Sequence, residues 1–180
     1  DWSSDVCSSD LKTITVNGNA VASELTPGIL TDVVKSGGNS AITGSVFFDG
    51  NDDLTVADSD DFHLSGNYTI ECFINRSVAP GTEVDFVSTW GASNRGFLLY
   101  INTSGKFGFA VSDDGSNVTN YGAGSTTIGA HEWHHLAVTN DGTTVRIFVN
   151  GVLEQSGATV TINNSSRDLV IGAETSQGNY

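Results

Sequence analysis

The sequence predicts an all-β domain built as a two-sheet antiparallel β-sandwich. Its composition favours strands and turns over helices: glycine occurs 21 times, proline twice and methionine not at all, while Thr, Ser, Asn and Val are common. Short apolar or alternating segments recur about every 8–12 residues with Gly-, Asn- and Asp-rich turns between them, and no amphipathic helix is visible. A chain of 180 residues is long enough for one such sandwich with a sizeable core.

Residues 1–11, DWSSDVCSSDL, differ in character from everything that follows. The segment is polar, repeats Ser-Ser-Asp and lacks both the strand and the helix period, and it resembles one reading frame of a common sequencing-adapter oligonucleotide. We expect it to be non-native, like a cloning scar. Without Asp1, Asp5 and Asp10 the acidic count falls from 21 to 18 and the formal charge from −14 to −11, and Cys72 has no cysteine partner for a disulfide.

A lead-in precedes the main run of strands. Two short β-prone segments, 14–16 and 20–21, flank the dipeptide Asn17-Gly18, which predicts a short hairpin with a tight turn. A Gly- and Ser-rich stretch at 35–40 follows and is typical of a flexible linker. We therefore expect residues 12–44 to be a lead-in or linker with a short hairpin.

From residue 45 onward, short strands and turns alternate. Tyr68, Ile70, Cys72 and Ile74 fall on one face of an alternating segment, so Cys72 is explained as a small buried hydrophobic residue. The dipeptide Asn150-Gly151 is typical of a type I′ hairpin turn. The expected strands are 45–48, 54–56, 68–74, 84–90, 97–101, 107–111, 133–139, 145–149, one that begins at 152, 160–162 and 169–171.

Residues 131–151, HEWHHLAVTNDGTTVRIFVNG, resemble the diagnostic segment of laminin G-like domains in the concanavalin A-like lectin superfamily. In that family a Trp-His-His-apolar-Ala strand precedes an Asp-Gly turn and a strand that ends Val-Asn-Gly. Three further segments agree in order: SVFFDGNDDL at 45–54, YTIE at 68–71 and LVIG at 169–172. The resemblance covers residues 45–180 and implies a jelly-roll, concanavalin A-like sandwich.

The family pattern continues into one more strand, which in such jelly rolls pairs with the first strand of the domain. The resemblance therefore implies that the last strand or strands of the domain at 45–180 are missing and that the C-terminus is cut off. We expect the backbone groups of residues 45–49 to lack a partner as a result.

Charge and hydropathy exclude two classes of partner. A formal charge of −14 repels the phosphates of DNA and RNA, so we expect no nucleic-acid binding. No run of 18 apolar residues exists in the sequence, so we expect no insertion into a membrane by a helix.

The sequence also argues against an enzyme. In the segment Trp133-His134-His135, neighbouring residues of a strand point to opposite faces, so the two histidines cannot act together, and Trp133 and His135 are explained by packing on a shared face. Glycoside hydrolysis needs two carboxylates across a cleft, and glucanases of this superfamily carry them on one strand as Glu-x-Asp-x-Glu. Nothing here matches that pattern, and Glu71 stands alone on its strand. We expect no catalytic residues.

The acidic turn after residue 48 is a candidate metal site. Asp49, Asp52 and Asp53 offer hard oxygen ligands within a few residues, which suits Ca²⁺, and the resemblance implies a structural calcium near this turn in some relatives. The alternative is that these residues are solvated turn acids.

Glycan binding uses aromatic rings that stack on sugar faces and polar side chains that bind hydroxyls. The candidate ligand-binding residues are Trp90 at a strand end, Asn94 in the loop that follows it, and Tyr121 before a Gly-rich stretch. The alternative for each aromatic residue is a half-buried position at a sheet edge.

The function that we expect is a non-catalytic recognition module, for carbohydrate binding or adhesion, in a larger multidomain protein that is extracellular, on the cell surface or in a virion. The opening SVFFDGNDDLTV also resembles domains of bacteriophage structural or tail proteins. Its partner would be a glycan or a cell-surface protein. The alternative is a protein-interaction or scaffold domain without a glycan site, and a glycoside hydrolase is the least favoured interpretation.

Overall fold

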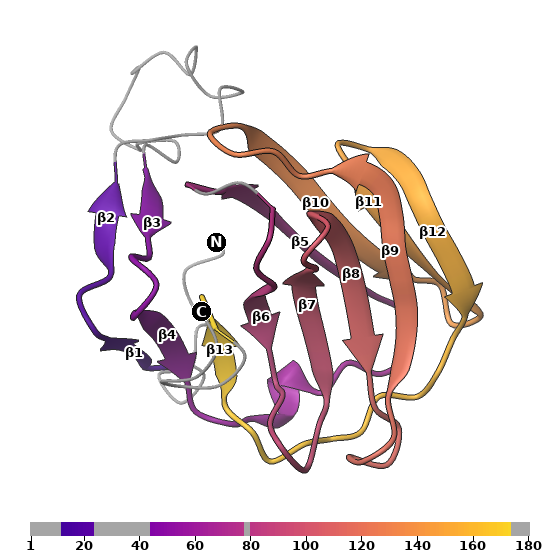
Figure 1. The fold of residues 1–180 in the computed structure, drawn as a ribbon. Coiled ribbons are helices and arrows are strands. Elements are labelled where there is room, and N and C mark those ends of the chain that lie inside the picture. The colour runs from indigo at the N-terminus through magenta and orange to yellow at the C-terminus, as the bar shows by residue number, and fades with distance from the viewer. Residues whose placement is uncertain (1–11, 24–43, 78–79, 174–180) are drawn as a thin grey trace, which may run out of the picture.

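The computed structural model describes residues 12–23, 44–77 and 80–173 (Figure 1). In these ranges the chain forms thirteen strands and one short 3-10 turn, η2 (Asp60–Phe62), and no α-helix. No helix in the described ranges is long or apolar enough to cross a membrane. The predicted all-β sandwich is confirmed, whereas the adapter interpretation of residues 1–11 and the linker at 35–40 lie outside the described residues.

Two antiparallel sheets form the two layers of the sandwich, one behind the other in Figure 1. The larger sheet has the strand order β1 (Ile14–Asn17), β4 (Asp53–Val56), β13 (Leu169–Ile171), β6 (Val84–Ser88), β7 (Phe97–Ile101), β8 (Lys106–Val111) and β9 (Thr119–Thr127). The smaller sheet has the order β12 (Val152–Ala158), β11 (Thr144–Val149), β10 (Trp133–Asn140) and β5 (Tyr68–Asn75).

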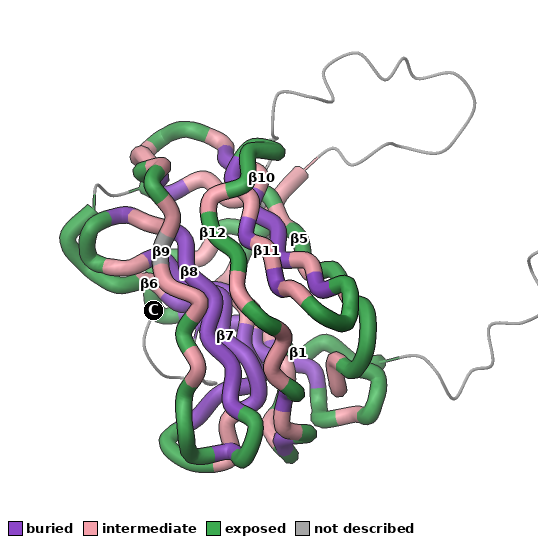
Figure 2. The backbone as a smooth tube through the Cα atoms, turned by 90° about the vertical axis from the view of Figure 1, so that its right-hand side faces the viewer, coloured by how far each residue is buried: buried purple, intermediate pink, exposed green. Residues whose placement is uncertain are grey.

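The core lies between the sheets and follows from the alternation of side chains along each strand. On β11, Val145, Ile147 and Val149 are at most 2% exposed, whereas the residues between them are half-buried. Burying one such side chain stabilises the fold by about 1.5–3 kcal/mol. The core also contains Phe86, Phe97, Leu99, Ile101, Phe107, Phe109, Val111, Ile128, Leu136, Val138 and Ile162. The purple segments of β7 and β8 in Figure 2 show this burial along the backbone.

The prediction that the segments on either side of Asn17-Gly18 pair with each other as a hairpin is wrong. β1 pairs with β4, and β2 (Val21–Ser23) pairs with β3 (Ser45–Phe47) in a separate two-stranded ribbon. The side-chain amide of Asn17 donates to Thr55 on β4, at 2.9 Å, so the turn redirects the chain from the large sheet into the ribbon. The expected lead-in thus contributes a strand to the sandwich, and the backbone at 45–47, expected to be unpaired, has β2 as its partner.

Two other expectations about strands need correction. Residues 160–162 form no strand; they belong to an extended connection from β12 to β13 whose Ile162 packs into the core. The strand β9 was not predicted, because its sequence TNYGAGSTT has no apolar alternation and reads as a Gly-rich loop. It nevertheless pairs with β8, with two irregularities in register that the glycines accommodate. The predicted type I′ turn is confirmed, since Asn150 and Gly151 have φ of 50° and 78°.

Candidate functional site

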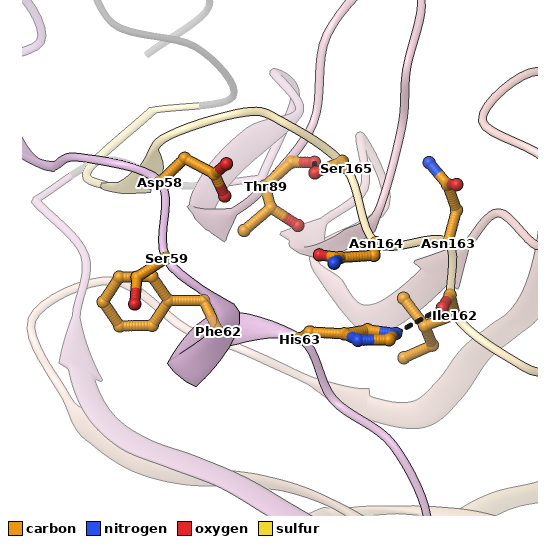
Figure 3. A pocket seen from close by; sticks show the side chains of 9 residues that line it. All are labelled: Asp58, Ser59, Phe62, His63, Thr89, Ile162, Asn163, Asn164 and Ser165. Atoms are coloured by element: carbon orange, nitrogen blue, oxygen red, sulfur yellow. Dashed lines mark hydrogen bonds between the residues drawn. The ribbon is translucent and has the colours of Figure 1, made fainter.

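Three connections meet at one end of the sandwich: β4 to β5, β6 to β7 and β12 to β13. Between them is a shallow pocket that opens to solvent (Figure 3). Its enclosed part measures only about 10 Å³, roughly the room for one water molecule, so a larger ligand would lie over its open mouth. Its lining residues are Asp58, Ser59, Phe62, His63, Thr89, Ile162, Asn163, Asn164 and Ser165.

The turn η2 positions one wall of the pocket. Ser59 caps it, because its Oγ accepts a hydrogen bond from the backbone N–H of Asp61 at 3.3 Å. Lys12 binds the Asp61 carboxylate at 2.7 Å, and this contact lowers the pKa of Asp61. The turn ends at His63, whose Nε2 donates to the carbonyl oxygen of Ile162 at 3.3 Å (Figure 3). This bond joins the two connections that face each other across the pocket.

The opposite wall is the extended segment before β13. Ile162 anchors it in the core and is 3% exposed. The amide of Asn163 donates to Oδ1 of Asn94 at 3.1 Å, and Ser165 donates to the carbonyl oxygen of Thr89 at 3.2 Å. The segment 162–165 pairs with no strand, and these side-chain contacts hold it in place. This wall of the pocket therefore has a fixed shape.

The floor of the pocket offers open hydrogen-bond acceptors. Figure 3 shows Asp58, His63 and Asn164 around one hollow, whereas the amide of Asn163 points away from it. The backbone N–H of Asp58 donates to Asp168 at 3.1 Å, but no described residue donates to the Asp58 carboxylate. These groups can bind the hydroxyls of a ligand.

Of the predicted ligand-binding residues, Asn94 and Trp90 lie in the β6–β7 connection beside the pocket. Asn94 supports the pocket wall, since its Oδ1 accepts from Asn163 and its Nδ2 donates to Ser166 at 2.7 Å. Trp90 is 7% exposed, and the guanidinium of Arg95 lies 5.6 Å from its ring centre. Trp90 thus has little surface for a ligand, and its role as a sugar platform stays a prediction that this burial does not favour.

Tyr121 lies on β9 and is not among the residues that line the pocket. Its ring stacks on Phe109 with 5.8 Å between ring centres. Its hydroxyl donates to the carbonyl oxygen of Ala158 at 3.0 Å and accepts from the backbone N–H of Val160 at 3.1 Å. Burial raises the pKa of this hydroxyl. These contacts fit the alternative interpretation, an aromatic residue that packs at a sheet edge.

Sequence reasoning missed Asp58, His63 and Asn164 as neighbours. Asp58 lies in an acidic turn, Asn164 begins an Asn-x-Ser triplet and His63 carries no motif, and none of these signals points to a shared pocket. The hydrogen bond from Nδ2 of Asn164 to Asp60, 3.3 Å long, joins residues 104 positions apart. No local signal in one sequence predicts such a contact.

The candidate calcium ligands are engaged by the protein itself. Asp52 and Asp53 are fully buried. Asp52 accepts from the backbone N–H of Asp49 at 2.9 Å, which lowers its pKa, and Asp53 accepts from the hydroxyl of Thr55 at 2.8 Å. Within the described ranges, no three acidic, His or Cys side chains gather as a metal site. Calcium binding by Asp49, Asp52 and Asp53 stays a prediction.

The segment Trp133-His134-His135 has the alternation that was predicted. His134 is 6% exposed and follows the inward positions of β10. His135 lies on the outer face, 4.9 Å from the ring centre of Phe73, with its Nε2 3.2 Å from the carboxylate of Glu71. The two histidines therefore lie on opposite faces of the sheet. Cys72 is partly buried on the inner face of β5, and burial raises the pKa of its thiol to about 12.

Two antiparallel sheets packed face to face, with a polar pocket among the loops at one end, define a lectin-like β-sandwich of the jelly-roll class. The chain belongs to the concanavalin A-like lectin/glucanase superfamily, because the laminin G-type model of that superfamily matches residues 48–180. A search of curated protein sequences found no match.

Several solved structures share this fold. Domain 4 of an extracellular arabinanase from Geobacillus stearothermophilus, in complex with arabinotriose, has a TM-score of 0.59 and 16% identity, over 93% of this chain and 76% of that one. The carbohydrate-binding module CBM66 from Bacillus subtilis has a TM-score of 0.51 and 13% identity, over 89% and 88%. The binding domain of botulinum neurotoxin serotype D has a TM-score of 0.59 and 16% identity, over 89% of this chain and 38% of that one. At these identities the similarity concerns the fold.

Proposed function

We propose that this chain is a non-catalytic glycan-recognition module that binds one sugar ring in the pocket between η2 and the segment 162–165. The observation that carries the proposal is the pocket itself: an open hollow in which the side chains of Asp58, His63 and Asn164 face a common space. Sugars present hydroxyls on every side, and a pocket with several convergent polar groups can orient them.

The apolar part of the pocket supports the same ligand. Phe62 is half-buried and lines it, together with Ile162. Sugar rings have apolar C–H faces that pack on aromatic and aliphatic side chains. A site that combines both kinds of surface fits a sugar better than a small inorganic ion.

The absence of catalysis is part of the proposal. Glycosidases place two carboxyl groups about 5–10 Å apart on either side of the scissile bond. Among the residues that line the pocket, Asp58 is the one carboxylate. A single acid can orient a hydroxyl, but it does not supply both an acid and a base or nucleophile.

We further propose that the module belongs to a larger protein outside the cell, on a cell surface or in a virion, including the tail proteins of bacteriophages. Two solved neighbours support a setting of this kind: one is a domain of an extracellular arabinanase in complex with arabinotriose, and one is a carbohydrate-binding module. Membership of a lectin superfamily also supports a glycan as the partner.

A protein-interaction or scaffold domain is the second candidate function. The observation that favours it is a group of exposed apolar side chains on β1 to β3: Ile14, Val16 and Phe47 are 60%, 55% and 48% exposed. Exposed apolar groups of this kind are typical of surfaces that contact another protein.

A glycan array with the full 180-residue chain, followed by titration calorimetry of the best ligand, tests the proposal. We expect Asn164→Ala to weaken binding at least tenfold, and Thr103→Ala, an exposed change in the β7–β8 turn, to leave it unchanged. A blank array contradicts the proposal and favours the scaffold function, whereas a ligand whose affinity is unchanged in Asn164→Ala contradicts glycan binding in this pocket.

A further inference from the structure

Most of the polar side-chain groups that remain open in the pocket are acceptors. Resting on the proposed function, we propose that the pocket selects uncharged sugars and rejects sugars that carry a carboxylate, with Asp58 as the residue that makes the distinction.

Most side-chain donors of the lining residues are already in use. Asn163 donates to Asn94 and to the carbonyl oxygen of Arg95, at 3.1 and 3.0 Å. Ser165 donates to the carbonyl oxygen of Thr89 at 3.2 Å. An acidic sugar needs donors for its carboxylate, and these amide and hydroxyl groups are committed to the protein.

Three further lining residues also donate hydrogen bonds to other groups of the protein. The hydroxyl of Ser59 donates to Asp61 at 3.2 Å, and Nδ2 of Asn164 donates to Asp60 at 3.3 Å. His63 donates from Nε2 to a backbone carbonyl. Two side-chain donors of the lining are left over: the second N–H of the Asn164 amide, whose other N–H binds Asp60, and the hydroxyl of Thr89, whose residue is 5% exposed.

Three acceptors face the hollow. The carboxylate of Asp58 receives no hydrogen bond from any described residue. Asn164 keeps its Oδ1 open, because its Nδ2 is the atom that binds Asp60. His63 in its neutral form has an acceptor at Nδ1, since Nε2 carries the proton that binds the Ile162 carbonyl. Acceptors pair with the O–H groups of a sugar and repel the oxygens of a carboxylate.

Charge near the pocket adds to this preference. Asp60 on η2 and Asp168, which accepts from the backbone of Asp58, are acids adjacent to the pocket. Two nearby cations are engaged elsewhere: Lys12 binds Asp61 at 2.7 Å, and Arg167 donates to the carbonyl oxygen of Ser93 at 3.1 Å. The formal charge of the whole chain, −14, has the same sign. Among the described residues that line the pocket there is no Lys or Arg to relieve the repulsion that an anionic ligand meets.

The test uses matched methyl glycosides that differ only in the carboxylate: glucose and glucuronate, galactose and galacturonate, mannose and mannuronate. Affinities are measured by calorimetry for the wild-type chain, Asp58→Asn and Asp113→Asn. Asp113 is exposed in the β8–β9 loop outside the pocket lining, so its variant removes the same charge elsewhere on the surface.

For whichever neutral sugar binds, we expect its acidic counterpart to bind at least tenfold more weakly at low salt. In Asp58→Asn that ratio falls to about twofold because the acidic sugar gains affinity, and in Asp113→Asn it stays as in the wild type. Equal or tighter binding of the acidic sugar by the wild type, or an equal gain in Asp113→Asn, overturns the inference but leaves glycan binding intact. If no sugar of either kind binds, the proposed function itself fails.

Discussion

The carboxylate of Glu154 on β12 accepts a hydrogen bond from the backbone N–H of Thr126 on β9, at 3.0 Å. The same carboxylate accepts from the hydroxyl of Ser125 at 2.8 Å. β12 is an edge of the small sheet and β9 is an edge of the large sheet, so this one side chain joins the two layers along one side of the sandwich. Gly124 leaves room for it, since a Cβ there would lie 2.6 Å from Oε2 of Glu154.

This contact predicts how the stability of the fold depends on pH. The hydrogen bonds from Thr126 lower the pKa of Glu154 to about 2 from an ordinary value of 4.5. Its contribution is therefore present above about pH 4.5 and is lost as the pH falls towards 2. We expect Glu154→Gln to melt at a lower temperature than the wild type at pH 7, with a difference that shrinks between pH 4.5 and 2. Thermal melts followed by circular dichroism measure this, with Glu83→Gln, an exposed change on the surface, as the control. A difference that grows as the pH falls contradicts the assignment.

The buried face of β11 predicts that shortening one of its side chains lowers the stability of the fold strongly. Ile147 is 0% exposed between the sheets, whereas Val152 on the next strand is 61% exposed. We expect Ile147→Ala to lower the free energy of unfolding by about 2–5 kcal/mol, and Val152→Ala to change it by less than about 0.5 kcal/mol. Urea titrations of the two variants measure both values. Equal effects are inconsistent with two facing sheets.

The burial of Trp90 predicts that its removal destabilises the protein, whether or not a ligand is present. It is 7% exposed and packs with Leu98, Tyr100 and Ala110 beneath the guanidinium of Arg95. We expect Trp90→Ala to destabilise the chain by about 3–5 kcal/mol, as measured by urea unfolding without any sugar present. A variant as stable as the wild type would indicate that Trp90 lies at the surface, and Trp90 would again be a candidate sugar-binding residue.

The acidic turn gives a prediction about calcium. If Asp49, Asp52 and Asp53 hold Ca²⁺, millimolar calcium raises the melting temperature of the wild type but not that of Asp49→Asn, because bound metal stabilises only the folded state. Asp49 is the exposed member of the three, so its substitution disturbs the fold least. A melting temperature that is unchanged over millimolar calcium shows that the buried acids serve the structure alone.

The fold could be predicted from the sequence because its strands carry their own patterns. Alternation at 68–74 and 145–149 predicts which residues face the core, and Asn150-Gly151 predicts its turn, since each signal is local. β9 could not be predicted, because TNYGAGSTT resembles a loop and becomes a strand only beside β8. Its tertiary pairing overrides its weak local preference.

The pocket could not be predicted for a related reason. Its walls come from residues 58–63 and 162–165, which meet only after the sheets have stacked. Aromatic residues near glycines, such as Trp90 and Tyr121, gave the sequence its candidate sugar platforms, yet the same apolar surface makes such residues pack into the protein. Of the predicted ligand-binding residues, Asn94 is the one that the structure ties to the pocket wall.

The central claim is that a sugar binds between η2 and the segment before β13, and nuclear magnetic resonance tests it most directly. A ¹⁵N-labelled chain is titrated with the best ligand from the array, and the shifts of the backbone amides are mapped. We predict that the largest shifts fall at residues 58–63, 89 and 162–165, around the pocket of Figure 3. Saturable shifts confined to another surface, such as the outer face of the small sheet around Phe73 and His135, would contradict the account.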